Sequence, residues 1–418
     1  MRKLIQKLKL FYRKLLIKIE ENIFILPDNI LYLFSKKKIK NEKCIVFAGT
    51  YMHARIARIA KWIKKTTDYQ SVLIAQKSVF TPQLSNDSFD QVHLFRNKWH
   101  LLSILKKYSG QKVIVHSFGP PHFAAYHIAV ENSKKPSNAK QNLFFDYQDL
   151  MVSNFGLRPP FLYMKKEISK EKFILKNVDG IISHSLELQT AKKYYGKDYP
   201  PILFFPIYAD NDSFVKEKKS DKNDFEQLSL VYVGGVYSKF RNKSYFGGQH
   251  LHWLIHKLNK QKVHFHIYPA PTNKKEDIQD YVEMNRSLKY FHLHEPLPQA
   301  NLISEIAKYD YGVIPFFHRT NKKLNDKRHY STSMKLFNFF EAGLPVIMGK
   351  DIDFQNFIGR KFGAAITLDY EDFDNLEKQL EHIDYKELVE NLVVNREYLS
   401  LKNKIHKLIE FYNKTGLK

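Results

Sequence analysis

The chain contains 418 residues, 44% of them hydrophobic, a length and composition that suit two folded domains and exclude a disordered protein. Its single cysteine, Cys44, excludes a disulfide framework and indicates a reducing compartment. Lys and Arg number 67 against 43 Asp and Glu, and the resulting net charge of +24 favours anionic partners such as nucleic acid, acidic lipid or phosphorylated substrates.

The N-terminal segment, residues 1–43, carries 12 Lys or Arg residues against four acidic ones. Its apolar residues recur at helical spacing between basic residues, which predicts an amphipathic helix lying in an anionic membrane interface. The apolar stripe consists of Leu4, Leu8, Phe11, Leu15 and Ile19. The alternative is a helix that packs on its own domain with solvated lysines. Because the chain has neither the apolar core of a signal peptide nor a run of about 18 apolar residues, we expect a cytoplasmic protein, peripheral on the inner face of the plasma membrane.

Residues 44–210 alternate between expected strands and helices, which predicts an α/β domain with a parallel, doubly wound sheet. The strands are expected at 44–50, 71–75, 112–118 and 142–147, and the helices at 53–65 and 98–108. Gly49 is the only glycine of the first strand-to-helix turn, so the G-x-G-x-x-G fingerprint is absent and no dinucleotide cofactor is expected.

Residues 211–227 are polar, charged and without hydrophobic periodicity, so we expect a linker there. A second α/β domain follows at 228–395, and the glycines that end its first strand, Gly234 and Gly235, permit a phosphate to approach the backbone closely. Further strands are expected at 263–270 and 291–297, helices at 247–259 and 300–308, and a final helix at 397–416.

Four histidines alternate with apolar residues on two of these strands: His264, His266, His292 and His294. Two such pairs with no nearby cysteine or aspartate cluster are weak evidence for a metal, and we expect no metal site and no cofactor.

The stretch 311–349 predicts a strand, a basic loop, a helix and a second strand, a unit that places ligands in the crevice beyond the strand ends. Ser331, Thr332 and Ser333 offer N-caps to a helix that runs to about Glu341, and a buried strand is expected at 344–348. The helix N-terminus is a ready anion site, with Lys335 in its first turn and Asn338 one turn on. The alternative is a packing helix with a solvated lysine.

The sequence KLFNFFEAGLPVI (335–347) resembles the nucleotide-sugar signature of GT-B glycosyltransferases, in the retaining "group 1" family. The matching residues are Lys335, Leu336, Phe337, Gly343, Pro345 and Val346. Asn338 stands where the family has the glutamate that grips the donor ribose, and Tyr330 stands where it has the other glutamate of the pair.

Other segments resemble the same family more loosely. In FFDYQDL (144–150), Asp146 and Asp149 match an aspartate-x-histidine-aspartate pattern, Gln148 replaces the histidine, and His116 on the neighbouring strand offers an imidazole instead. A strand and the turn after it match at Asp179, Gly180, Ile181, Ile182 and Ser185. Ile207 takes the position of a family asparagine.

The resemblance implies a GT-B architecture: two facing Rossmann-like domains with parallel sheets, and a C-terminal helix (396–418) that packs back on the first domain. The second domain would hold a nucleotide sugar and the first an acceptor. The implied catalytic residues are His116, Asp146 and Asp149. The implied donor-binding residues are Gly234, Gly235, Lys239, Arg241, Arg319, Ser333, Lys335, Asn338 and Glu341. The implied acceptor-side residues are Gly49, Thr50, His53 and Gln148.

The resemblance also implies a retaining glycosyltransferase that needs no metal, with its donor diphosphate stabilised by amides and cations. Combined with the basic helix, they favour a lipid-linked or membrane-anchored glycan acceptor in capsule, lipopolysaccharide or glycolipid assembly. A nucleic-acid-binding protein would be equally basic, but no reader motif is present and no nucleic-acid partner is expected. A degenerate GT-B protein that binds without turnover remains the alternative, because of the departures at Tyr330, Asn338, Gln148 and Ile207.

Overall fold

The computed structural model describes residues 25, 27, 28, 30, 43–80, 87–108, 113–215, 228–240, 249–315 and 326–416, without the side chains of Asn138, Gln299, Ala300 and Asp326. The predicted amphipathic helix, most of the predicted linker, Arg241 and Arg319 therefore lie outside the described residues. The chain divides into two compact units. Unit 1 comprises 1–184, 190–205 and 405–418, and unit 2 comprises 185–189 and 206–404.

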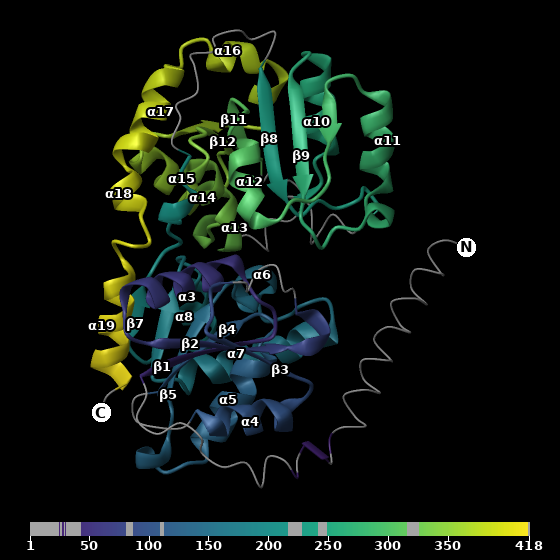
Figure 1. Ribbon diagram of the computed structural model, residues 1–418. Helices are drawn as coiled ribbons and strands as arrows, with labels where there is room; N and C mark the ends of the chain where they lie inside the picture. The colour runs from purple at the N-terminus through teal and green to yellow at the C-terminus, as the bar shows by residue number, and fades with distance from the viewer. Residues whose placement is uncertain are drawn as a thin grey trace. The chain divides into compact units, whose positions relative to one another are not determined.

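Unit 1 is built on a seven-stranded sheet in the order β3-β2-β1-β4-β5-β6-β7, and all its strand pairs are parallel (Figure 1). The strands are β1 Cys44–Gly49, β2 Gln70–Gln76, β3 Gln91–Phe95, β4 Val113–Gly119, β5 Asn142–Tyr147, β6 Gly180–Ser183 and β7 Ile202–Phe204. The central strands β1 and β4 are buried along their whole length, as expected for a parallel sheet covered on both faces.

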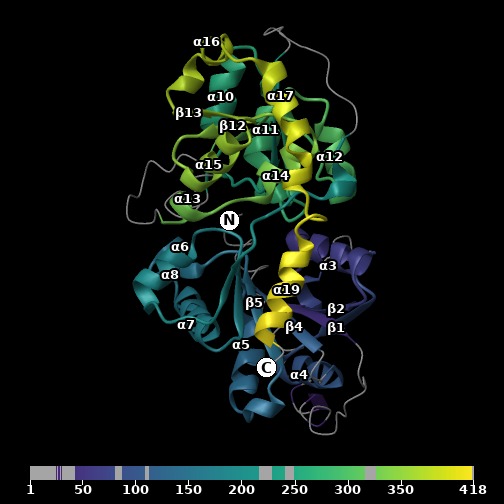
Figure 2. The ribbon, with the colours of Figure 1, turned by 90° about the vertical axis from the view of Figure 1, so that its left-hand side faces the viewer.

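The helices of this half of the chain are α3 Ala54–Thr66, α4 Lys98–Lys107, α5 Phe123–Ser133, α6 Met151–Phe155, α7 Leu162–Lys176 and α8 Leu188–Tyr195, with 3₁₀ turns at Lys77–Val79, Ser137–Ala139 and Asn211–Ser213. The C-terminal helix α19, Ile405–Gly416, also belongs to unit 1, where it lies beside β5 (Figure 2). Its Tyr412 is fully buried against Phe144 and His116.

One part of the N-terminal segment can be placed. Asp28 is 1% exposed, and its carboxylate accepts hydrogen bonds from Arg96 Nη2 at 2.7 Å and Asn97 Nδ2 at 2.8 Å. Asn97 is also the N-cap of α4, where its side chain accepts from the amides of Trp99 and His100. At Asp28, therefore, the segment is held against unit 1.

Unit 2 is built on a six-stranded parallel sheet in the order β10-β9-β8-β11-β12-β13. The strands are β8 Ser229–Gly234, β9 His264–Pro269, β10 Phe291–Leu293, β11 Tyr311–Ile314, β12 Val346–Gly349 and β13 Ala365–Leu368. The helices are α10 His252–Lys260, α11 Gln279–Ser287, α12 Gln299–Ile306, α13 Asp326–Tyr330, α14 Met334–Glu341, α15 Asp353–Lys361, α16 Leu376–Leu380, α17 Tyr385–Val394 and α18 Arg396–Leu399, with 3₁₀ turns at Lys275–Asp277 and Asp372–Asp374. Two hydrophobic clusters cover the two faces of this sheet.

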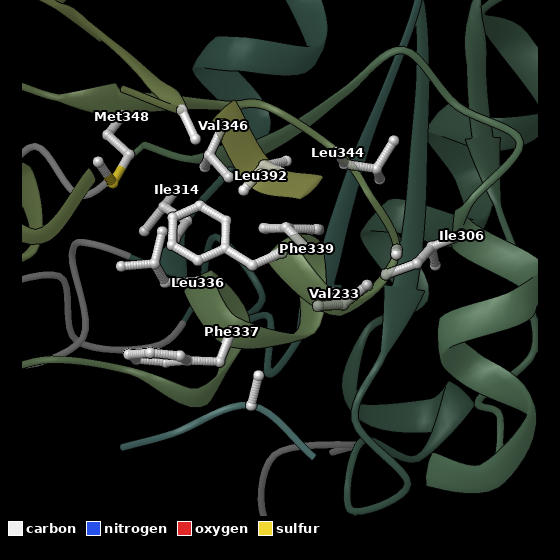
Figure 3. Close-up of a cluster of buried hydrophobic side chains, with 14 of the residues drawn as sticks. Val233, Ile306, Ile314, Leu336, Phe337, Phe339, Leu344, Val346, Met348 and Leu392 are labelled. Atoms are coloured by element: carbon white, nitrogen blue, oxygen red, sulfur yellow. The ribbon is translucent and has the colours of Figure 1, made fainter. Parts of the chain in front are cut away.

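Helix α14 is fixed by one of these clusters. Leu336, Phe337 and Phe339 lie among side chains from the sheet strands and from Leu392 of α17 (Figure 3). The helix can approach β11 because Gly312 has no side chain: a Cβ there would lie 2.3 Å from the ring of Phe339. The predicted helix and the strand after it are confirmed, and the helix ends at Glu341 as expected.

The single helix expected at 397–416 is instead two helices, α18 and α19, separated by Ser400–Lys404. Ser400 and Leu401 are drawn out of helical geometry because they pair with Ala209: Leu401 N donates to Ala209 O at 2.9 Å. None of the described helices is long and apolar enough to cross a membrane.

Candidate functional site

In unit 2, the candidate anion site lies where β8 ends and α14 begins. Gly234 has φ +110°, a conformation that glycine adopts readily and other residues rarely do. A Cβ at this position would lie 2.8 Å from Lys335 Cε and 3.3 Å from Nζ, so the lysine stem rests on the Gly234 backbone. Lys335 Nζ also lies 5.5 Å from the centre of the Tyr232 ring. The fold therefore brings a cation, a bare stretch of backbone and a helix N-terminus together.

The N-terminus of α14 lacks the side-chain cap that its serines and threonine offered. Ser333 is the N-cap residue, but its side chain accepts no hydrogen bond from the first turn, and its Oγ donates to Gln355 Oε1 at 3.0 Å instead. Thr332 is 7% exposed, and its Oγ1 has no hydrogen-bond partner among the described residues. Helix N-terminal amides that no side chain caps are well suited to an anion, because the helix dipole adds a partial positive charge there.

The loop after β8 is held in shape by side chains. Asn273 accepts from Val236 N at 3.1 Å and donates to Val236 O at 2.9 Å, and Tyr232 OH donates to Gly235 O at 2.8 Å. Lys239 N donates to Asp280 Oδ2 at 2.7 Å. Burial would raise the pKa of Asp280, but hydrogen bonds from His252 and the Lys239 amide lower it to about 2. The Lys239 side chain itself is exposed, with Nζ 5.3 Å from the Phe240 ring centre.

Two other expected donor residues lie on α14. Asn338 is 6% exposed, one turn after Lys335. Glu341 is fully buried, and its Oε1 accepts from the Asp210 amide at 2.8 Å, so at least one carboxylate oxygen is engaged by the segment after β7. Ile207 of that segment lies in the same hydrophobic cluster as Leu336, which accounts for an apolar residue there. Ribose binding by Asn338 and donor binding by Glu341 remain predictions.

In unit 1, His53 is the histidine best suited to meet a ligand. It lies just after β1, its ring bonds to the backbone of Pro120, and its Nε2 has no hydrogen-bond partner among the described residues. Burial lowers its pKa, although Asp149, the Pro120 contact and Asp146 act in the other direction. At neutral pH the ring is therefore neutral, and Nε2 carries either a lone pair or a proton for a hydroxyl group. Nearby, Thr50 Oγ1 is likewise buried without a partner in the part of the chain that the structure describes.

His116 and Asp146 form a fully buried cluster with Arg55 and Tyr412. Arg55 Nε donates to Asp146 Oδ2 at 3.1 Å, and Arg55 Nη2 donates to Phe205 O at 2.8 Å. His116 Nε2 lies 3.4 Å from Asp146 Oδ2, and its Nδ1 bonds to Tyr412 OH. Burial would raise the pKa of Asp146, but the Arg55 charge and His116 lower it, so the carboxylate is ionised. With His116 and Asp146 fully buried, this cluster suits positioning, and their direct catalytic role remains a prediction.

Asp149 and Gln148 follow β5 and are half-buried, and Gln148 Nε2 donates to Asp146 Oδ1 at 3.4 Å. His184 follows β6, and its Nδ1 bonds to the Tyr147 carbonyl at 2.8 Å. Burial, with the Arg55 charge as a smaller cause, lowers the pKa of His184 to about 4. Sequence analysis missed Arg55 and His184. The signal for His184 was its place directly after a buried strand, at the carboxyl edge where parallel sheets gather their polar residues.

Comparison with known proteins bears on both units. Residues 244–407 match the family described as glucosyltransferase 3-like, C-terminal domain. The solved structure of sucrose-phosphate synthase from Thermosynechococcus elongatus is similar over 89% of this chain and 99% of that one, with TM-score 0.65 and 10% identity. Anabaena HepE in complex with UDP-glucose is similar over 89% and 98%, with TM-score 0.58 and 11% identity. The chain has the GT-B fold.

The trehalose-6-phosphate phosphatase N-terminal domain of Candida albicans has the same fold, with TM-score 0.59 and 11% identity over 91% of this chain and 98% of that one. No curated protein sequence matches this chain significantly. The expected GT-B architecture with two Rossmann-like domains is thus confirmed, and the family match of residues 244–407 agrees with the expectation of a glycosyltransferase.

Proposed function

We propose that this glycosyltransferase moves a hexosyl group, glucose in the first place, from a uridine diphosphate sugar to a membrane-associated glycan or lipid-linked acceptor, with retention and without a metal. Glucose is suggested by the family matched by residues 244–407, and the uridine nucleotide by the UDP-glucose bound to HepE. The observation that carries the proposal is the contact of Lys335 with Gly234 beside the N-terminus of α14.

The chemistry follows from where charge develops. As the bond from the anomeric carbon to the diphosphate breaks, negative charge grows on the departing oxygen. Lys335 and the first-turn amides of α14 stabilise that negative charge, and they are already in place before the reaction. The acceptor oxygen forms the new bond on the same face of the sugar, and its proton passes to the leaving diphosphate. This chain's residues supply two positive groups, a cation and a helix terminus, for the role that a divalent metal fills elsewhere.

On the acceptor side, we assign His53 to an acceptor hydroxyl. Its ring is neutral, its Nε2 has no hydrogen-bond partner among the residues that the structure describes, and both features suit a hydrogen bond to an alcohol. Asp149 contributes a carboxylate that acts electrostatically on the same ring. The Arg55–Asp146–His116 cluster holds the backbone at Phe205 through Arg55 Nη2. The acceptor itself would then be recognised by unit 1.

A surface of unit 1 supports a membrane-associated acceptor. The turn into α7 exposes four large apolar side chains: Leu157, Phe161, Leu162 and Tyr163. Leu162 is 70% exposed, and the rings of Phe161 and Tyr163 stack at 5.8 Å. Exposed Arg158, Lys165 and Lys166 flank them. Contiguous exposed apolar side chains bordered by basic ones are what an anionic lipid surface recognises.

The membrane part is tested with full-length protein and anionic vesicles. Leu162→Ser with Tyr163→Ser should reduce binding at any salt concentration, whereas Lys165→Gln with Lys166→Gln should reduce it mainly at low salt, because salt screens charge. Phe357→Ser, which removes an aromatic ring 55% exposed on unit 2, is the matched control. Replacing Leu8, Phe11 and Leu15 with Ser separates the contribution of the N-terminal segment. Wild-type protein that ignores anionic vesicles at low salt would refute the membrane assignment.

Donor binding is tested by thermal unfolding with UDP, GDP and ADP, since a ligand at about 100 times its Kd stabilises the folded state by roughly 2.7 kcal/mol. Lys335→Ala should weaken UDP binding by about 1.5–3 kcal/mol, because a charge-assisted phosphate contact is lost. Lys378→Ala, which removes an exposed lysine from α16, should change nothing. Equal UDP affinity in both variants would overturn the site.

A second candidate function is binding without turnover. It is favoured by one observation: Tyr330 and Asn338 occupy positions where the resembling family has carboxylates. Release of UDP from UDP-glucose by the wild-type protein would exclude it, and tight UDP binding with no release would favour it.

A further inference from the structure

The edge of the unit 2 sheet carries a column of stacked histidines that the transferase site does not use. His264 and His266 lie two residues apart on β9 and so share one face of the sheet, and His292 of β10 is the direct cross-strand partner of His266. The ring centres are 5.2 Å apart for His264 and His292, 4.3 Å for His292 and His266, and 5.2 Å for His266 and His294.

One potential ligand nitrogen from each of His264, His266 and His292 lies within 4.8 Å of the others. His264 Nδ1 and His292 Nε2 are 2.9 Å apart, and so are His266 Nδ1 and His294 Nε2. Two imidazole nitrogens bound to one tetrahedral metal at about 2.0–2.1 Å are roughly 3.4 Å apart. The 2.9 Å between His264 and His292 is shorter than this separation, and the 4.8 Å limit for the three residues is longer, so modest ring rotations bring three nitrogens to one ion.

We propose that His264, His266 and His292 form a binding site for a divalent transition-metal ion of the kind that prefers imidazole, Zn²⁺ in the first place. Three neutral histidines with a fourth position open to water are an established zinc ligand set, and imidazole also suits Cu²⁺ and Ni²⁺. The site is separate from glycosyl transfer and acts as a clamp between β9 and the three-residue edge strand β10.

Binding of an ion does not require the pair of His264 and His292 to lose a proton. The hydrogen bond between His264 and His292 can give way to an ion without net loss of a proton, because each ring can carry its single proton on the other nitrogen.

His294 supplies outer support. With the proton of His266 on Nδ1, donated to His294 Nε2, His266 keeps its lone pair on Nε2, as a second contact often fixes the tautomer of a ligating histidine. Tyr309 packs on His266 with ring centres 4.4 Å apart, and Tyr268 stacks on His294 at 4.3 Å. The nearby cation, Lys308, is paired with Glu305.

The test uses the full chain, stripped of metal with a chelator and titrated with Zn²⁺ by calorimetry and with Co²⁺ by visible absorption. We expect one Co²⁺ per chain with the absorption of a tetrahedral site, and slower hydrogen exchange in β10 when Zn²⁺ is bound. His292→Gln should weaken binding by more than about 100-fold, since loss of a mere supporting contact already costs 10–100-fold.

Two matched controls sharpen the result. His294→Gln, in the same stack but outside the convergent set, should lose less than His292→Gln, and His256→Gln, an exposed histidine on α10, should lose nothing. Thermal unfolding without metal checks that each variant is folded, and His264→Gln replaces His292→Gln if that variant does not fold. Absence of one-to-one binding, or losses equal in His292→Gln and His256→Gln or in His292→Gln and His294→Gln, would overturn the three-ligand site.

Discussion

The two sheets end their first strands alike, with a glycine, but for different reasons. At Gly49, which ends β1, a Cβ would lie 2.1–2.4 Å from atoms of the Phe118 ring, so the residue must be small for packing. At Gly234, which ends β8, the backbone has positive φ and a Cβ would meet the stem of Lys335. One glycine makes room for a core ring, and the other makes room for a cation. The same position in one fold thus admits a core ring in unit 1 and the stem of a lysine in unit 2.

The charged side chains near the two strand ends also differ in their burial. In unit 1, Asp146 is buried with Arg55 and His116, and the charge of Arg55 compensates that of Asp146. In unit 2, Lys335 is half-buried beside a helix start whose N-cap residue, Ser333, makes no capping hydrogen bond. Buried ion pairs resist the loss of one partner, whereas a half-buried cation at a helix terminus remains able to meet an anion.

The largest effect should come from breaking the buried pair of unit 1. Arg55→Ala leaves Asp146 as an uncompensated buried charge and should lower the free energy of unfolding by about 3–5 kcal/mol. Urea unfolding measures it. Lys64→Ala, which breaks the half-exposed pair with Asp90 at 3.0 Å, should cost less than about 1 kcal/mol. Similar costs for both variants would contradict the view that burial makes the unit 1 cluster rigid.

Replacement of Gly49 and of Gly234 with alanine should have different effects, one on the free energy of unfolding and the other on UDP binding. Gly49→Ala overpacks the Phe118 pocket and should cost at least about 1–3 kcal/mol of stability, measured by urea unfolding. Gly234→Ala strains the backbone and displaces Lys335, so UDP binding should fall more than tenfold even where the fold is retained, measured by calorimetry.

Gly235→Ala is the control for both glycine variants, since a Cβ there meets its nearest atom, Gln249 Nε2, at an ordinary 3.6 Å. If Gly49→Ala lost UDP binding while keeping its stability, the contrast between the two strand ends would be wrong.

Acid should act on unit 1 through its buried histidines. The pKa of His184 is about 4 in the folded protein and about 6.5 when unfolded, so the unfolded chain binds more protons between these values. Stability is then complete above about pH 6.5 and falls as the pH drops towards 4, by up to about 1.4 kcal/mol per pH unit for this group. His127, whose pKa burial also lowers to about 4, adds to the same loss.

His184→Gln should therefore flatten the dependence of the free energy of unfolding on pH, measured by urea unfolding at a series of pH values. His406→Gln removes an exposed histidine of α19 and serves as control. An unchanged slope in His184→Gln would show that this ring is not held neutral by burial.

The smallest effect concerns Asn338 on α14. If its amide bonds to the donor ribose, Asn338→Leu should weaken UDP binding by about 0.5–1.5 kcal/mol, while Asn338→Asp should keep or improve it because carboxylate is the stronger acceptor. Calorimetry measures the affinity of each variant for UDP and for pyrophosphate, which has no ribose. Only the UDP affinity should change on substitution of Asn338. Equal UDP affinities in both variants would place Asn338 in the helix packing alone.

Local patterns in the sequence were enough to predict much of the secondary structure of unit 2. The hydrophobic period and the glycine and proline after Glu341 predicted α14 and the strand after it, and both lie where expected. The prediction works because a helix between two buried strands is specified by residues a few positions apart. The positive φ of Gly234 fits a glycine for the same kind of reason, since backbone freedom is a property of the residue itself, while the approach of a phosphate there stays a prediction.

The contacts between residues that are distant in the sequence were decided by tertiary structure alone. His116 meets Tyr412 across 296 positions, because α19 lies beside β5, and Arg55 meets Asp146 across 91. The histidines of β9 and β10 gave no convincing signal in sequence, because spacing along a strand does not reveal the register of its neighbour. The sequence determined the alternation of apolar and polar residues, the residues able to cap helices and the positions of turns. Which side chains face one another depended on strand order, register and helix docking, which no local pattern contains.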